Sequence, residues 1–293
     1  MYLSRFKLIL LLFISVSVTL LNGCKNAKAV TPSGNEAFSF AFLTDIHLNN
    51  GNNNCFDGLR KAINSAKSKD VDFIITGGDN CDIDVLGSDS NTAHDLYNRF
   101  SSVLKSSGIT FYPALGNHDR FYGVPASDPL YNEGLFESYM EVKSYYSFNH
   151  KGWHFIILNT ANSYVDDAQK TWLKKDLYNT SSSTPIVLVV HVPFLSVYYP
   201  ALYGNYTSTD TTKDFKKIWD LFLGHNLKLV LQGHMHLYEE IKVLDTQFVT
   251  AGAVSASWWA GPYYGTQEGY LKVDIDESGN VAWQYIDYGW SVK

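Results

Sequence analysis

The sequence predicts an α/β fold on the strength of three observations. Six short apolar runs are typical of buried strands, and segments with helical spacing of apolar residues separate several of them. Such alternation implies βαβ crossovers with parallel strand pairing. The 293 residues are 45% hydrophobic and 18% charged, which suits ordinary cores, and we find no internal repeat, heptad pattern or long linker.

The expected elements follow one another in a regular order. Strands are predicted at residues 37–43, 71–76, 109–115, 154–160, 185–190 and 227–232. Helices are predicted at residues 56–69, 91–107, 167–178 and 212–225. After residue 238 the helical pattern stops, and strand-like stretches follow at 239–245, 248–252, 270–276 and 281–288. We expect these last four to pair antiparallel and to complete or extend a sheet.

The first 36 residues are expected to lie outside a folded domain of residues 37–293. Arg5 and Lys7 precede a 14-residue apolar run, which is too short to span a bilayer comfortably and is typical of a signal peptide. The Leu-Asn-Gly-Cys sequence ending at Cys24 resembles a bacterial lipobox, which implies a signal peptide of residues 1–23 and a lipid on Cys24. An ordinary cleaved signal is the alternative. Either one predicts export to the cell envelope, with residues 24–36 as a flexible tether.

Charge and cysteine content exclude several classes of partner and site. Removing the signal peptide leaves 21 basic residues against 29 acidic ones, a net charge of −8. Without a basic cluster this surface does not suit nucleic acid, so phosphate binding would need a local cation. Export permits disulfides, and Cys55 and Cys81 are either a bridge or two unpaired buried thiols. Two cysteines are too few for a zinc cluster.

Polar motifs follow five of the expected strands. Because ligands bind outside the carboxyl ends of strands in an open α/β sheet, we expect the five segments to converge on one edge. Turn propensity explains any single Gly-Asp or Gly-Asn, but not a hard oxygen or an imidazole at every turn. The other four histidines are expected to be structural or surface residues: His94, His150, His154 and His225. The motif residues are Asp45 and His47, Asp79, Asn117 with His118 and Asp119, His191, and His234 with His236.

These motifs predict a metal centre. Apart from His118 and Asp119 they offer two carboxylates, one amide oxygen and four imidazoles, a mixture that suits Mn, Fe, Zn, Ni or Co. The lack of a thiolate argues against structural zinc. Seven ligands are too many for one tetrahedral ion and suit two divalent ions that share a carboxylate. His234 and His236 stand two apart in an expected extended segment, so both should point to one side, although a lone His-x-His is more often structural.

The ordered set Asp-x-His, Gly-Asp, Gly-Asn-His-Asp, His and Gly-His-x-His resembles the calcineurin-like metallophosphoesterases. The resemblance runs over residues 45–236 and implies a four-layer sandwich, in which two mixed β-sheets pack face to face with helices outside. It also implies one metal held by Asp45, His47 and His236 and a second held by Asn117, His191 and His234, with Asp79 bridging both.

Two such ions would lower the pKa of a shared water, so that a bridging hydroxide attacks phosphorus in line. His118 is expected to protonate the leaving alkoxide, with Asp119 orienting its ring and raising its pKa; a structural role for His118 is the alternative. Arg120 either contacts a phosphate oxygen or is solvated. Asp82 stands where purple acid phosphatases carry a tyrosine ligand, and His47 is present, which favours the diesterase and general phosphoesterase branches.

The sequence therefore predicts an enzyme that hydrolyses small phosphate esters, monoester or diester, whose organic group can be a sugar or a nucleoside. Aromatic residues at 194–206 and 257–265 should lie near the mouth of the site, where they either stack that group or plug the end of the sandwich. Nuclease action is disfavoured by the charge balance. A catalytically inactive module that binds phosphorylated glycans at the cell surface is the alternative, against which the retained His118 argues.

Overall fold

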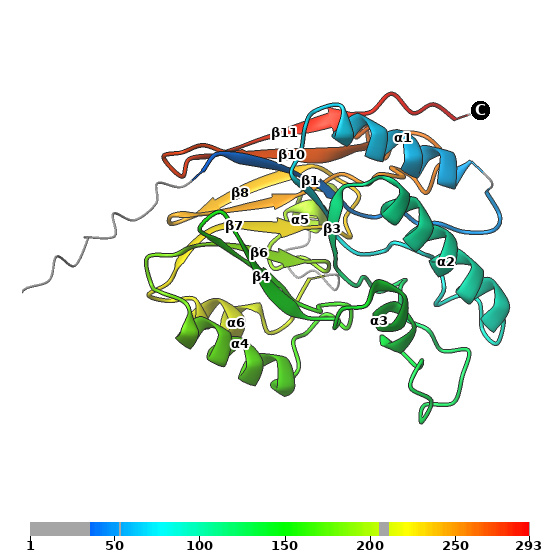
Figure 1. Ribbon diagram of the computed structural model, residues 1–293, viewed down its shortest axis with the longest axis horizontal. Coiled ribbons are helices and arrows are strands. Elements are labelled where there is room, and N and C mark those ends of the chain that lie inside the picture. The colour runs from blue at the N-terminus through cyan, green and yellow to red at the C-terminus, as the bar shows by residue number, and fades with distance from the viewer. Residues whose placement is uncertain (1–35, 53, 205–210, 293) are drawn as a thin grey trace, which may run out of the picture. The chain divides into compact units, whose positions relative to one another are not determined.

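Two mixed β-sheets carry the fold in the computed structural model, which describes residues 36–52, 54–204 and 211–292 (Figure 1). The five-stranded sheet has the order β11-β10-β1-β2-β3, in which β1 and β2 pair parallel, as do β2 and β3, and β10 joins β1 antiparallel. Its strands are β1 (Phe38–Leu43), β2 (Phe73–Thr76), β3 (Thr110–Pro113), β10 (Gly269–Ile275) and β11 (Val281–Asp287).

The six-stranded sheet has the order β4-β5-β6-β7-β9-β8, with a parallel centre and antiparallel pairs at both edges. Its strands are β4 (Tyr146–His150), β5 (Trp153–Ile157), β6 (Pro185–Val190), β7 (Asn226–Gln232), β8 (Glu239–Val243) and β9 (Thr246–Thr250).

Alternation of side chains along the strands divides the core into three layers of apolar contact. In β1, Phe40 and Phe42 face the other sheet, while Ala41 and Leu43 face the helices on the outer side. The six-stranded sheet repeats the pattern in β7, with Leu229 and Leu231 in the layer between the sheets and Val230 on the outer side.

Helices cover the two outer faces. The helices α1 (Cys55–Lys67), α2 (Ser90–Ser106) and α3 (Gly134–Met140) pack on the five-stranded sheet, and α4 (Asp167–Asn179) and α6 (Phe215–Leu221) pack on the six-stranded sheet (Figure 1). The short α5 (Tyr198–Tyr203) follows β6. The predicted four-layer sandwich is therefore confirmed.

Several details differ from the sequence-based expectation. The strand β4 and the helices α3 and α5 were not predicted, and the helix expected at 212–225 is limited to α6, because turns precede and follow it. The strands after residue 238 are not all antiparallel, since β9 pairs parallel with β7. After β7 the chain first forms β8 at the edge of the sheet. It then turns back and forms β9 between β8 and β7, so that β9 is antiparallel to β8 and parallel to β7.

The predictions for the amino-terminal segment lie outside the described residues, namely the signal peptide at 1–23, the lipid site Cys24 and most of the tether at 24–36. Within the part of the chain that the structure describes, no helix combines the length and apolar character needed to cross a membrane. Cys55 and Cys81 are both buried free thiols, which decides against the bridge.

Candidate metal centre

Loops from both sheets form the candidate metal centre. Those after β1, β2 and β3 carry residues 45–47, 79 and 117–119, and those after β6 and β7 carry residues 191 and 234–236. We expected one sheet edge, whereas the carboxyl ends of strands from two packed sheets meet here. The structure brings together all seven residues that the sequence marked as metal ligands: Asp45, His47 and His236; Asp79, His191 and His234; and Asn117, whose Oδ1 lies 3.2 Å from His191 Nε2.

The first group is fully buried and has its ligand atoms at short range. His47 Nε2 lies 3.0 Å from His236 Nε2, and Asp45 Oδ1 lies 3.4 Å from His236 Nε2. The other nitrogen of each ring is already engaged, because His47 Nδ1 bonds Asp82 Oδ1 at 2.6 Å and His236 Nδ1 donates to the Ala256 carbonyl at 2.5 Å.

These hydrogen bonds fix the chemistry of the facing nitrogens. A carbonyl only accepts, so His236 carries its proton on Nδ1 and presents a lone pair at Nε2. Burial, against the pull of Asp45, lowers the pKa of His236 to about 4, which keeps the ring neutral. With His47 donating Nδ1–H to Asp82, two nitrogen lone pairs and a carboxylate oxygen would face one another. Only a cation between them, a metal ion or a proton, relieves that repulsion.

In the second group, Asp79, His191 and His234, a ring nitrogen again faces acceptor atoms. His191 donates Nδ1–H to the Gly77 carbonyl at 2.9 Å, so its Nε2 faces two acceptor oxygens, Asp79 Oδ2 at 3.0 Å and Asn117 Oδ1 at 3.2 Å. The His234 ring packs at 5.3 Å from the His191 ring, measured between centroids. Although burial lowers the pKa of His191, Asp79 outweighs it and raises that pKa to about 9. In the metal-free chain a proton therefore occupies the place of a cation.

Asp79 lies between the two groups. Its Oδ2 is 3.0 Å from His191 Nε2 and 3.8 Å from His47 Nε2, while its Oδ1 accepts a hydrogen bond from the His118 backbone N–H at 2.8 Å. Burial would raise the pKa of Asp79, but the imidazoles of His191 and His47 hold it well below the usual range. A buried carboxylate in contact with both groups is suited to act as one ligand shared by two metal ions.

Most of these side chains stand on strained backbone. The left-handed conformation, with φ between 50° and 72°, occurs at Asp45, His47, Asp79, His234 and His236. The expectation of an extended segment at His234 and His236 is therefore wrong, although both rings still reach the centre. Gly116 and Gly233 follow from the same crowding, because a Cβ at these positions would collide with Asp79 and with Thr44 and Asp45 respectively.

His118 sits beside the first group, with its ring centroid 5.1 Å from that of His47. Its Nδ1 bonds Asp84 Oδ1 at 2.9 Å. Burial lowers the pKa of His118, but Asp84 and Asp79 outweigh burial and raise it to about 10. The His118 side chain is 30% exposed, unlike the buried His47 beside it.

The expected contact between Asp119 and His118 is wrong. The Asp119 carboxylate is fully buried and accepts hydrogen bonds from the backbone N–H groups of Gly116, Asn80 and Cys81 and from the Tyr97 hydroxyl. Burial, reinforced by the Asp79 charge, raises its pKa to about 6. Asp119 therefore ties the loops after β2 and β3 together, and Asp84 takes the place at the ring.

Sequence reasoning missed two carboxylates around the centre, Asp82 on His47 and Asp84 on His118. The available signal was the sequence Asp79-Asn-Cys-Asp-Ile-Asp84, which places two more acids directly after a strand-end motif. Arg120 bonds Asn132 Oδ1 at 2.8 Å and stacks over the Tyr122 ring, so it is held by its own loop.

Comparison with known proteins agrees with this geometry. Residues 38–238 match the model of the calcineurin-like phosphoesterase family, more than half of the chain. The chain belongs to that family. The family and the clustered histidines and aspartates together support metal-dependent hydrolysis of phosphoesters in general, and the cluster fits a divalent metal site.

Relatives of this calcineurin-like phosphoesterase carry several names. Purple acid phosphatase 23 of Arabidopsis thaliana is 29% identical over 187 residues, which are 63% of this chain but 33% of the relative, so the chain matches about a third of that protein. A protein named "Probable cyclic nucleotide phosphodiesterase" from Fibrobacter succinogenes is 26% identical over 194 residues, 64% of this chain and 67% of the relative.

Solved structures show the same fold. A dimetal phosphatase from Danio rerio is 13% identical with a TM-score of 0.60, over 86% of this chain and 99% of that one. An anchor protein in the inner membrane complex of Plasmodium is 17% identical with a TM-score of 0.59, over 86% of this chain and 85% of that one.

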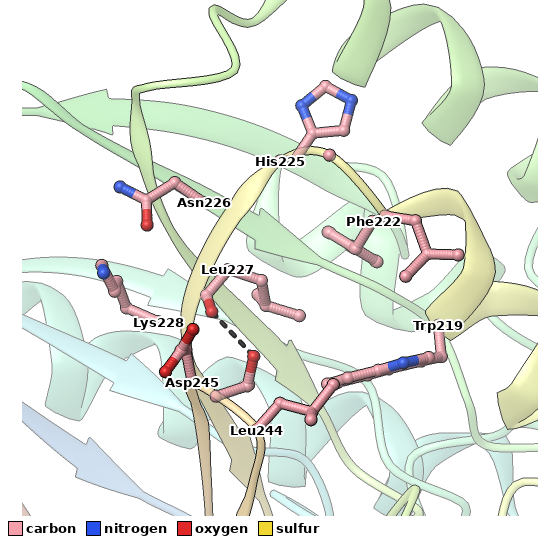
Figure 2. Close-up of a pocket in the computed structure, with 11 residues that line it drawn as sticks. Trp219, Phe222, His225, Asn226, Leu227, Lys228, Leu244 and Asp245 are labelled. Atoms are coloured by element: carbon pink, nitrogen blue, oxygen red, sulfur yellow. Dashed lines mark hydrogen bonds between the residues drawn. The ribbon is translucent and has the colours of Figure 1, made fainter.

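The calcineurin-like phosphoesterase has one pocket beside the metal centre and another far from it. One of about 200 Å³ adjoins His234 and His236 and is walled by Tyr198, Trp258 and Tyr263. Another of about 230 Å³ lies between Trp219 and the turn at Leu244, at the amino end of β7 (Figure 2). Because His234 follows the other end of β7, the pocket in Figure 2 is a strand length away from the metal centre.

Proposed function

We propose that this chain is a dinuclear metallophosphoesterase that hydrolyses small phosphate esters. The observation that carries the proposal is the position of Asp79 Oδ2 between His47 Nε2 and His191 Nε2. Each of these nitrogens also faces another candidate ligand atom, His236 Nε2 for His47 and Asn117 Oδ1 for His191. A buried set of lone pairs and carboxylates is costly unless cations neutralise it. Two divalent ions do so and leave a positive site for phosphate in an otherwise acidic protein.

The seven residues divide between two ions in this proposal. Asp45, His47 and His236 would hold one of them, and Asn117, His191 and His234 the other, with Asp79 shared. The donor set of imidazoles and oxygens, without a thiolate, suits Mn, Fe, Zn, Ni or Co. When bound, such ions lower the pKa of a water and stabilise charge on phosphate oxygens. Asp82 would orient His47 by holding its Nδ1 proton.

His118 would act as the general acid. Its Nδ1–H is held by Asp84, which leaves Nε2 as the nitrogen free to serve a substrate. As water adds to phosphorus and the P–O bond to the leaving group breaks, that oxygen would take the proton from Nε2, and the proton lost by the attacking water would return through solvent to His118. A raised pKa keeps the donor charged at neutral pH, and the products are an alcohol and the corresponding phosphate.

Turnover of p-nitrophenyl phosphate and bis-p-nitrophenyl phosphate tests the proposal. The chelated chain should be inactive, and Mn or Zn should restore p-nitrophenolate release. His118→Ala should lower kcat by about 100-fold or more for an alkyl ester such as ribose 5-phosphate, whose leaving alkoxide needs the proton, and much less for the p-nitrophenyl esters, with unchanged metal content. His94→Gln is the matched control, because this histidine bonds Tyr139 away from the centre. Preference between the two esters distinguishes a monoesterase from a diesterase. Two bound ions with no turnover of either ester would instead support the binding module.

We also propose that the protein is exported and carries a lipid on Cys24. The proposal is supported by the charged, apolar and Leu-Asn-Gly-Cys segments in the first 24 residues. Labelling with a fatty-acid analogue in a bacterial host should mark the wild type and leave Cys24→Ser unmarked. A soluble, unlabelled mature protein would point to the ordinary cleaved signal.

A further inference from the structure

Trp258 is an exposed aromatic residue set directly on the candidate centre. Its ring stacks on the His236 ring at 4.2 Å between centroids with an interplanar angle of 29°, yet 46% of the residue remains exposed. The neighbouring Trp259 is only 3% exposed and packs in the core behind α1. The two tryptophans therefore have different roles, and only Trp259 plugs the end of the sandwich.

The segment that carries Trp258 is fastened to the backbone of the first motif. Ser255 Oγ donates to the Asp45 carbonyl at 2.8 Å, and Trp259 Nε1 donates to the His47 carbonyl at 3.2 Å. The Ala256 carbonyl in turn accepts the Nδ1–H of His236. The position of Trp258 is thus tied to the same residues that would hold the first ion.

This segment also contains strained backbone. Ala256, Trp258 and Trp259 have φ of 42°, 48° and 69°, in the left-handed region that non-glycine residues rarely adopt. Such strain persists only where surrounding contacts impose it, and it concentrates at ligand-binding sites. The strained conformation leaves a large apolar face of Trp258 in water, so the conformation does not contribute to stability by burying this side chain.

The adjoining pocket restricts the kind of group that fits. Its volume of about 200 Å³ is smaller than that of pockets for drug-sized ligands and suits a single ring system. Trp258 and Tyr263 meet edge to face at 5.9 Å, and the Tyr263 and Tyr198 hydroxyls lie 2.9 Å apart. Among the described residues that line it there is no lysine, arginine, aspartate or glutamate. The pocket therefore favours an uncharged ring with a few polar edges.

We propose that Trp258 is a stacking platform for an uncharged planar ring, such as a nucleobase, in the organic part of the phosphate ester. The inference rests on the proposed function, because the ring would extend from a phosphate held at the metal centre. Trp258 and Tyr263 would then determine specificity without taking part in bond breaking.

Adenosine 5′-monophosphate and ribose 5-phosphate form a matched pair for the test, because both release a primary alkoxide at C5 of ribose and differ at C1, where one carries adenine and the other a hydroxyl. Phosphate release by the metal-loaded chain should favour the adenosine compound by about 5- to 150-fold in kcat/KM, the range of base stacking on an aromatic side chain. Trp258→Leu should bring this ratio close to one, and Trp258→Phe should keep part of it. Tyr178→Ala, an exposed aromatic on α4, should leave the ratio unchanged.

Calorimetry separates this inference from the proposed function. The Kd ratio of the two compounds on the metal-loaded chain needs no turnover, so it also decides the matter for a strict diesterase or an inactive protein. A preference for the adenosine compound that Trp258→Leu removes supports the platform even without hydrolysis. A wild-type ratio near one in binding, or a preference that Trp258→Leu leaves intact, overturns it.

Discussion

Removing the divalent ions should make the free energy of unfolding fall as the pH rises from about 6.5 to about 9. Asp79 raises the pKa of His191 from its ordinary 6.5 to about 9, against the opposing effect of burial. A group whose pKa is raised on folding adds stability that is complete below its unfolded pKa and is lost as the pH passes its folded pKa. At about 1.4 kcal/mol per pKa unit, this shift corresponds to about 3.5 kcal/mol.

Urea unfolding at several pH values between 6 and 9 measures this loss in the presence of a chelator. The metal-loaded chain should lose less stability over this range, because a divalent ion would take the place of the proton between His191 and Asp79. His191→Gln should reduce the slope and leave the part that the raised pKa of His118 contributes, whereas His154→Gln, a buried histidine bonded to Asn149 and Asp176, should retain the whole slope. Equal stability of the chelated wild type at pH 6.5 and pH 9 would refute the idea that a proton substitutes for the ion.

Three substitutions test individual contacts around the centre, and one labelling experiment tests the two cysteines. Asp84→Asn should lower kcat about 10- to 100-fold at constant metal content, because Asp84 holds the His118 ring. Asp82→Asn should instead weaken metal affinity by a similar factor, because Asp82 holds the His47 ring. A loss of metal affinity in Asp84→Asn and of kcat in Asp82→Asn would contradict these two roles. Gly116→Ala should reduce both metal content and Tm, because its Cβ would collide with Asp79, and unchanged values of both would contradict the crowding. Alkylation without reductant should label Cys55 and Cys81 only after unfolding, and failure to label the unfolded chain would reveal a bridge.

The sequence was sufficient to predict which residues meet, because the argument needed only strand ends and ligand chemistry. Apolar runs located β1, β2, β3, β6 and β7, and each was followed by an imidazole, a carboxylate or an amide. The division of these strands between two sheets came only from family resemblance, since the apolar pattern of a buried strand is the same in either sheet. For the same reason the parallel pairing of β9 was missed.

Local geometry was beyond prediction where tertiary contacts override backbone preference. Asp and His adopt left-handed backbone more often than most non-glycine residues but still rarely, so the sequence could not locate it at Asp45 or His234. The partner of His118 is similarly set by packing. Asp119 is next to it in sequence, but three backbone N–H groups draw its carboxylate into the core, and Asp84 approaches from the preceding loop.

The distribution of charge between the sheets suggests why the centre needs its ions. Both carboxylates of the candidate ligand set, Asp45 and Asp79, come from loops of the five-stranded sheet, whereas the six-stranded sheet contributes only imidazoles to that set, at His191, His234 and His236. In the metal-free chain the two halves are linked here by protonated His191 against Asp79, an attraction that is lost as the pH rises through the raised pKa of His191. Each ion would draw ligands from both halves, so metal binding should stabilise the packing of the two sheets as well as the site, in proportion to the logarithm of the free metal concentration above its Kd.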